Sequence, residues 1–406
     1  MTRIYFDHNA TTAVDPAVLD AMLPCFSADF ANASSIHAPG QRARAAIETA
    51  RGQVAALLGA KPQEIVFTSG GTESDNHAIF GAVAHALAPS NSTSGAPAAS
   101  TKPPHIITTS IEHEAVHSPC QHLEERSVAV TYLPASKDGV IDPENVRRAI
   151  RPETILISVM HANNELGSIQ PVAEISRIAR EHKIIFHTDA VQSAGKIPVD
   201  VNALGVDLLS ISGHKLYAPK GVGALYVRTG TRLDPLIYGG HHQRGFRPGT
   251  ENVAGIVGLG KAAELARHSL ASDAARVSAL RDRLERGVLD RIPQTRVNAA
   301  KAERTPNTSN IQFSGVEGES LVIALDLKGL ACSAGAACSS GAVEPSHVLT
   351  AIGLSRPEAK SSLRFSLGRH TTEAEIDLAL DAISAAVAQL RSISPVFQNQ
   401  VATHHD

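Results

Sequence analysis

The sequence predicts an α/β protein with a large domain, built on a mostly parallel sheet covered by helices, and a smaller C-terminal α/β domain. Short β-rich runs alternate with segments of helical apolar spacing between residues 64 and 227. The runs lack clean alternation of apolar and polar residues, as is typical of strands buried on both faces of a parallel sheet. In such sheets, ligands collect where strands end and loops begin.

The individual elements follow from the same patterns. Strands are expected at residues 64–70, 105–110, 128–134, 154–162, 183–190, 207–215 and 223–227. Apolar spacing predicts a helix over 171–183. Farther along, we expect one or two long amphipathic helices over 261–292, strands at 307–314 and 361–369, and a helix over 372–393 that opens with a Thr–Thr–Glu cap.

The change to a mainly helical pattern predicts two domains. Residues 13–260 form the large domain, and residues 1–12 join residues 261–406 in the small one. The small domain carries a loop, about residues 331–343, whose Ser, Ala and Gly residues predict mobility. The run 89–104 is rich in Pro, Ser, Ala and Gly and cannot bury apolar area, so it predicts a solvated insertion.

The composition is that of an ordinary globular protein. Of the 406 residues, 43% are hydrophobic and 19% are charged, and the net charge of −3 gives no hint of a nucleic-acid partner. We expect no membrane span and no signal peptide, because neither pattern occurs. The four scattered cysteines match neither a disulfide framework nor a zinc site. A cytoplasmic location without a metal site is therefore expected.

A glycine turn follows the first of the expected strands. The stretch 68–80, TSGGTESDNHAIF, runs from a strand through Gly70 and Gly71 into a helix. The glycines let a ligand approach the backbone, Thr72 offers a hydroxyl, and a helix start offers unpaired N–H groups. These features predict a cradle for a phosphate, although a plain helix cap fits the same residues equally well.

Two later strands also end in polar residues. Asp189 closes a strand, where it can face a ligand or pair with a protonated ring nitrogen. Asp189 and His187 lack a third ligand for a metal at a sensible spacing. Lys215 ends the next strand, ahead of a Pro/Gly-rich turn. Most lysines are surface charges, but partial burial would lower the pKa of this amine and free it for a Schiff base.

The motifs as an ordered set resemble those of one family. Along nearly the whole chain the sequence contains DHNATT, FTSGGTESDN, EHEAV, MHANNELG, DAVQSAGK, SGHKLYAPKG, RPGTEN, EGES, SAGAACSSGAVEPSHVL and SSLRFSLGR. Their order and spacing are similar to those of cysteine desulfurases of the NifS/IscS type. That family belongs to the class V aminotransferase group, binds pyridoxal 5′-phosphate, and has the fold called PLP-transferase fold type I. Each motif alone is a weak signal, whereas the ordered set is specific.

The resemblance implies catalytic roles for three residues. Lys215 is the Schiff-base lysine and moves protons at the substrate α-carbon, and His113 stacks on the pyridine ring. Cys338 is the nucleophile: its thiolate takes the substrate sulfur as a persulfide, and alanine leaves. In place of the family's frequent Ser-Ser-Gly-Ser-Ala-Cys, this chain has Ser-Ala-Gly-Ala-Ala-Cys at 333–338, which alters the polarity of the loop and not its chemistry.

The resemblance also implies how the cofactor and the substrate are held. Asp189 pairs with the ring nitrogen, Gln192 with the ring oxygen, and Arg364 with the substrate carboxylate. Asn164 binds both that carboxylate and the cofactor. The phosphate ligands are Gly71, Thr72, Ser212 and His214, together with Thr250 from the neighbouring subunit of a homodimer.

The activity implied is conversion of L-cysteine to L-alanine, with sulfane sulfur passed from Cys338 to an acceptor for iron–sulfur cluster assembly or other sulfur-containing products. Cys338 would meet metal only transiently, in a cluster on a partner protein. A selenocysteine lyase or another class V enzyme is the alternative, although transamination needs no nucleophilic thiol. A catalytically dead sulfur-trafficking partner would lack Lys215, Asp189 or Cys338, and all three are present.

Overall fold

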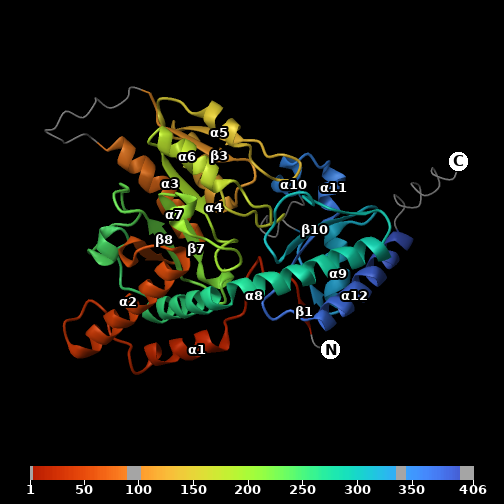
Figure 1. Cartoon of the computed structure of the whole chain (residues 1–406), viewed down its shortest axis with the longest axis horizontal. Coiled ribbons are helices and arrows are strands. Elements are labelled where there is room, and N and C mark those ends of the chain that lie inside the picture. Colours follow the sequence, from red (N-terminus) through yellow and green to blue (C-terminus); the bar gives the residue numbers. More distant parts are fainter. Residues whose placement is uncertain (1–2, 89–101, 335–343, 394–406) are drawn as a thin grey trace.

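The computed structural model describes residues 3–88, 102–334 and 344–393. Its main feature is a seven-stranded sheet in the order β2-β8-β7-β6-β5-β3-β4. Figure 1 labels β3, β7 and β8 of this sheet. The strands are β2 (Ile65–Thr68), β3 (His105–Thr109), β4 (Ala129–Leu133), β5 (Thr154–Ser158), β6 (Ile185–Asp189), β7 (Leu208–Ser212) and β8 (Gly223–Val227). All neighbouring pairs from β7 to β4 are parallel, so the predicted mostly parallel sheet is confirmed.

Strand β8 is the exception, since it runs antiparallel to both β7 and β2. Only residues 213–222 connect β7 to β8. A parallel return needs a crossover of about a dozen residues or more, so this short connection has to turn the chain back. Lys215 lies inside this tight connection.

Apolar side chains cover both faces of the sheet, because successive residues of a strand point to opposite sides. In β3, Ile106 belongs to a core cluster with residues of α3 (Gly71–Leu87) and α4 (Glu114–Glu124). Its neighbour Ile107 belongs to the cluster on the other face, which includes residues of α2 (Ala38–Leu58). Burial on both sides explains why the strands read as continuous apolar runs.

Shorter helices complete this part of the molecule. The α-helices are α1 (Pro16–Met22), α5 (Pro143–Ala149), α6 (Val172–Glu181) and α7 (Val201–Leu204), and the 3₁₀ turns are η1 (Leu23–Phe26), η2 (Pro62–Glu64), η3 (Gly213–Lys215) and η4 (His242–Gly245). The predicted helix over 171–183 corresponds to α6.

A second core lies around a three-stranded antiparallel sheet in the order β12-β10-β9. Its strands are β9 (Thr295–Val297), β10 (Thr308–Phe313) and β12 (Ser362–Ser366), and beside it β1 (Ile4–Tyr5) pairs in parallel with β11 (Leu330–Ala331). The helices of this core are α9 (Gly318–Leu327) and α12 (Glu373–Ser392). The short helices α10 (His347–Ala351) and α11 (Arg356–Lys360) pack their apolar residues in the core of the large sheet instead. The two strands and the final helix predicted for this part of the chain are confirmed, and Thr372 and Glu375 form the capping box of α12.

Helix α8 (Val253–Arg291) joins the two cores as one continuous helix of 39 residues (Figure 1). Its apolar residues up to Ala266 pack in the core of the large sheet, and those from Val277 onward pack in the second core. The predicted domain boundary at residues 260 and 261 falls inside this helix, so the two-domain division stays a prediction.

Some expectations concern residues that the structure does not describe. Most of the predicted insertion at 89–104, the central part of the cysteine loop with Cys338, and the tail after residue 393 lie outside the described ranges. Within those ranges, no helix combines the length and the apolar content needed to cross a membrane.

Candidate active site

The candidate site is a cavity of about 290 Å³ at the carboxyl ends of the parallel strands. Strands β3 and β5 are neighbours in the sheet although β4 lies between them in the chain, and ligands of α/β sheets bind at such switch points. The cavity is lined by ten of the residues singled out in the sequence: Gly71, Thr72, His113, Asn164, Asp189, Gln192, Ser212, His214, Lys215 and Arg364.

One end of the cavity is formed by the start of α3. A Cβ on Gly71 would lie 2.9 Å from Val191 Cγ2, which is too close for any side chain. The bare backbone of this first helical turn therefore lies open to a ligand, beside the hydroxyls of Thr72 and Ser212. Backbone N–H groups and hydroxyl groups side by side suit the binding of an anion such as a phosphate.

His214 lies at the same cavity and contributes polarity without charge. Its Nδ1 lies 3.1 Å from Thr11 Oγ1. Burial, and then the charge of Lys215, lower the pKa of His214 to about 4. The ring is therefore neutral near pH 7 and can offer a ligand an N–H or a lone pair, according to its tautomer.

Asp189 ends β6 and is only 6% exposed. Its Oδ1 accepts a hydrogen bond from the backbone N–H of Val191 at 2.8 Å. Burial, and then repulsion from the buried Asp75, raise the pKa of Asp189 to about 7. A cation placed against this carboxyl group would favour its ionised form, as a protonated ring nitrogen does.

His113 caps the start of α4 and lines the cavity. Its Nδ1 accepts a hydrogen bond from the backbone N–H of Ala115 at 3.1 Å. Burial lowers the pKa of His113, although the nearby Asp189 opposes this effect. The ring is thus neutral and carries its proton on Nε2, so Nε2–H is the group that can donate.

The N-terminal segment holds the amine of Lys215. Lys215 Nζ donates to the backbone oxygen of Asn9 and, at 2.7 Å, to that of Ala10. Asn9 and Ala10 also line the cavity. The first residues of the chain thus form part of the site wall.

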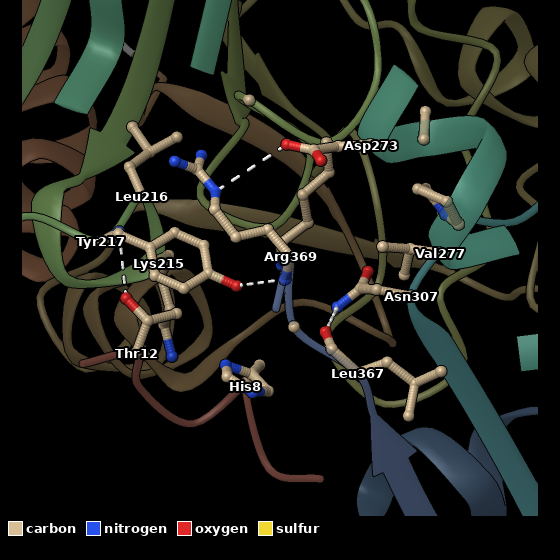
Figure 2. A pocket seen from close by; sticks show the side chains of 15 residues that line it. His8, Thr12, Lys215, Leu216, Tyr217, Asp273, Val277, Asn307, Leu367 and Arg369 are labelled. Atoms are coloured by element: carbon tan, nitrogen blue, oxygen red, sulfur yellow. Dashed lines mark hydrogen bonds and ion pairs between the residues drawn. The ribbon is translucent and has the colours of Figure 1, made fainter. Parts of the chain in front are cut away.

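Contacts of Tyr217, two residues after Lys215, restrict the turn that carries Lys215 (Figure 2). Tyr217 has a φ of 64°, which is uncommon for a residue other than glycine. Its backbone N–H donates to Thr12 Oγ1 at 2.9 Å, and its phenol oxygen accepts from the backbone N–H of Arg369 at 2.7 Å. The Arg369 guanidinium also lies 4.3 Å above the Tyr217 ring. These contacts tie the turn to the segments that follow β1 and β12.

Arg364 and Asn164 meet at another side of the cavity. The Arg364 side chain is 4% exposed, and it donates from Nη1 to the backbone oxygen of Asn164 at 3.1 Å and from Nη2 to Asp7 Oδ1 at 2.7 Å. Arg364 Nε and Asn164 Oδ1 are buried and have no hydrogen-bond partner within the described residues. Buried polar atoms normally have partners, so this pair retains hydrogen-bonding capacity for a ligand.

Of the other two predicted site residues, the structure describes only one. Thr250 is exposed in the loop before α8 and does not line the cavity of its own chain. Cys338 lies outside the described residues. Cys332 is buried in the second core, where burial raises the pKa of its thiol to about 12, so it is an inert core residue.

Sequence reasoning missed several residues at the cavity. Besides Asn9 and Ala10, they are Asp75, Ala115, Met160 and Val191. The polar run DHNATT was the available signal for Asn9, because a polar segment directly after a strand commonly faces a ligand. Among the described residues, no group of three or more His, Cys, Asp and Glu side chains is arranged to hold a metal ion.

The fold and the site together define the class of protein. The chain belongs to the class-V aminotransferase family, whose model matches residues 4–379. The same matched range spans both sheets and the segment that contacts Lys215.

Individual relatives give a more specific comparison than the family does. The chain is 50% identical over 396 residues to the cysteine desulfurase IscS of Dictyoglomus turgidum, covering 98% of this chain and 97% of the relative. It is 48% identical over 400 residues to the cysteine desulfurase IscS of Methanosarcina thermophila, covering 98% and 96%. Among solved structures, a NifS-like protein superposes with a TM-score of 0.86 at 36% identity, covering 96% of this chain and all (100%) of that one. SspA in complex with cysteine superposes with a TM-score of 0.78 at 39% identity, covering 91% and 100%.

Proposed function

We propose that the protein is a pyridoxal-phosphate-dependent cysteine desulfurase, which converts L-cysteine to L-alanine and leaves the sulfur on Cys338 as a persulfide. One observation carries the proposal. A lysine amine, a buried carboxyl group and an Arg–Asn pair line one cavity, in a chain that is 50% identical to cysteine desulfurases over nearly its whole length.

The residues of the cavity fit pyridoxal phosphate. Its phosphate matches the open backbone at Gly71, its ring nitrogen matches the buried carboxyl group of Asp189, and its carbonyl carbon needs an amine such as that of Lys215. When bound, the cofactor supplies an electron sink for negative charge that develops at the substrate α-carbon.

Substrate orientation is the proposed task of Arg364 and Asn164. A guanidinium with a spare buried N–H suits a carboxylate, because a charge-assisted hydrogen bond in a site shielded from water is strong. Asp7 and the Asn164 backbone hold the Arg364 guanidinium in place, so the α-carboxylate would be bound in one orientation.

Proton transfer is assigned to the Lys215 amine, which takes the proton from the substrate α-carbon and returns one. Neutral His113 has a different part, because its Nδ1 is occupied by the N–H of Ala115 and only its Nε2–H is available in the cavity. That N–H can donate a hydrogen bond to an atom that gains negative charge during the reaction.

Sulfur transfer is assigned to Cys338. Its thiolate bonds to the substrate sulfur, the bond between that sulfur and the substrate Cβ breaks, and the carbon gains a proton to become the methyl group of L-alanine. The persulfide then needs an acceptor, for which we propose a scaffold protein of iron–sulfur cluster assembly or another sulfur acceptor. We further propose a homodimer that works in the cytoplasm, with Thr250 of each subunit at the other subunit's phosphate.

The test is the visible absorption spectrum of the purified protein before and after L-cysteine is added, with alanine assayed in the same tube. We expect a cofactor band that changes with L-cysteine, and alanine formed when a thiol is present. In Cys338→Ala the band should still change while alanine does not form, and Cys25→Ala, at a partly buried cysteine, serves as the control. Alanine formed at the normal rate by Cys338→Ala would refute the role of this cysteine. A colourless protein that stays inert after incubation with pyridoxal phosphate would refute the function.

A further inference from the structure

A second lysine lies behind the cavity, in a network that the proposed chemistry does not use. Lys196 Nζ donates to Gln192 Oε1 at 2.7 Å and to Asn9 Oδ1 at 3.1 Å. Gln192 Nε2 in turn donates to the backbone oxygen of Asn9 at 3.0 Å. Of these residues, Gln192 and Asn9 line the cavity, whereas Lys196 lines only the small pocket behind it.

The chemistry of these partners determines which way the Gln192 amide points. A carboxamide has a donor end and an acceptor end of nearly the same shape, so packing alone does not distinguish them. The backbone oxygen of Asn9 can only accept, so it selects the NH₂ end, and the Lys196 amine selects the oxygen end. The amide oxygen is thereby turned to Lys196, and the second N–H of Gln192 remains for a ligand.

We propose that Lys196 is a positioning residue that holds the Gln192 carboxamide with a hydrogen-bond donor facing the cavity. The proposal rests on the proposed function, in which Gln192 contacts an oxygen of the cofactor ring. Without Lys196, the amide oxygen loses its partner, and only the contact of Nε2 with the Asn9 backbone oxygen still orients the amide.

The arrangement does not depend on the charge of Lys196. Burial and the nearby cations Lys215 and Arg364 lower the pKa of Lys196 well below its usual range. A neutral amine still has two N–H groups, and Gln192 and Asn9 accept one hydrogen bond each. The Gln192 oxygen therefore keeps a hydrogen-bond donor in either protonation state, although only the charged amine is unable to accept.

The test uses the holoenzyme and the pH at which the visible absorption of its bound cofactor changes. A donor N–H stabilises a ring-oxygen anion, so losing it should move this midpoint to higher pH. We expect Lys196→Met to raise the midpoint by at least about half a pH unit, since a hydrogen bond to a charged group is stronger than a neutral one. Gln192→Leu should raise it by a similar amount, and Lys196→Arg, which keeps donor groups, should restore most of the wild-type value.

The double variant separates positioning from direct electrostatics. If Lys196 acts through Gln192, Lys196→Met should add no shift in the Gln192→Leu background. A full additional shift there would mean that the lysine acts by its own charge, and an unchanged midpoint in the single variant would mean that it has no role; either result overturns the proposal. Asn307→Ala is the matched control, because Asn307 donates to the same Asn9 Oδ1 at 2.9 Å without touching Gln192.

A variant that fails to fold still leaves the proposal testable. Lys196→Ser keeps a polar group that is too short to reach Gln192 Oε1, so its midpoint should approach that of Gln192→Leu. A wild-type midpoint in a folded Lys196→Ser protein would contradict the proposal. A wild-type protein without any cofactor band would instead contradict the proposed function.

Discussion

Lys215 is the residue on which the proposed chemistry depends most directly. Its Nζ lies in the cavity wall against Asn9 and Ala10, and no second lysine lines this cavity within the described chain. We expect Lys215→Ala to lose the characteristic cofactor band and to reduce alanine formation by roughly 10²–10⁴-fold or more, the range typical of a lost acid–base group. The absorption spectrum measures the loss of the band, and the alanine assay measures the loss of activity. Lys220→Ala, at an exposed lysine five positions farther on, should keep both properties.

The buried carboxyl group of Glu112, next to His113 in the chain, leads to a separate prediction about pH. Glu112 Oε1 accepts from Thr109 Oγ1 at 2.8 Å and from the backbone N–H of Met160 at 2.9 Å, and burial raises the pKa of Glu112 from 4.5 to about 8. Between these two pH values the folded protein keeps a proton that the unfolded chain has lost. The contribution of Glu112 to stability therefore falls as pH rises through this window.

Glu112→Gln removes this titration and keeps the shape of the side chain. Relative to wild type, the melting temperature of the variant should rise as pH goes from 5 to 8, by roughly 2–5 °C. Differential scanning calorimetry at both pH values measures this difference, in which all other titrating groups cancel. A difference that stays constant with pH would show that Glu112 is ionised in the folded protein throughout.

At the scale of elements, the contact between α2 and α8 relies on a glycine. A Cβ on Gly260 would lie 2.5 Å from Ala50 Cα, which is backbone and cannot give way without moving a helix. We expect Gly260→Val to destabilise the protein by about 1–3 kcal/mol, as overpacking of a core does. Denaturant unfolding of the wild type and of Gly260→Val measures this difference in the free energy of unfolding.

Gly52, on α2 itself, is the matched control. A Cβ at Gly52 would meet nothing within 4 Å. Gly52→Ala should therefore stabilise the protein by roughly 0.5–1 kcal/mol, because a helical glycine loses more backbone freedom on folding than alanine does. If both substitutions had the same effect, the close helix approach would not matter to stability.

At the scale of the whole molecule, the position of Thr250 suggests an assembly. Thr250 is exposed and does not line the cavity of its own chain, and the apolar side chains of Phe30 (72%) and Tyr238 (80%) are exposed as well. If Thr250 serves the other subunit, each site of a dimer combines residues of two chains.

Mixed dimers of two defective chains test this directly. In a dimer of one Lys215→Ala chain and one Thr250→Ala chain, a shared site leaves one of the two sites intact, so about half the wild-type activity per dimer should return. If Thr250 worked within its own chain, neither site would be intact and no activity would return. Tagged chains that are co-expressed and purified by both tags allow the measurement, with each parent homodimer as reference.

Much of this molecule follows from local patterns. The strands from β2 to β8, the final helix with its Thr372 cap, and the residues gathered around one cavity were all expected, because burial on both faces and helical spacing leave a signal within a few residues. The resemblance of the ordered motifs supplied the site residues, since motifs keep their order along the chain.

Other features had no local signal. The antiparallel direction of β8 depends on the short link after β7. The expected one or two long helices are a single helix, α8, and no local pattern shows that it runs through both cores. The part played by the N-terminal segment was missed as well. Asn9 accepts a hydrogen bond from Gln192, which is 183 positions away, and Asp7 binds Arg364 across 357 positions.

The sequence by itself thus determined the class of fold, most elements and the chemical groups of the site, because these depend on residue type and short-range spacing. Only the tertiary structure decided how those groups are held. The orientation of the Gln192 amide between Lys196 and Asn9, the contacts that hold Lys215, and the proton on Nε2 of His113 depend on partners and on burial. Hydrogen-bond partners and burial are set only when distant segments of the chain come together in the fold.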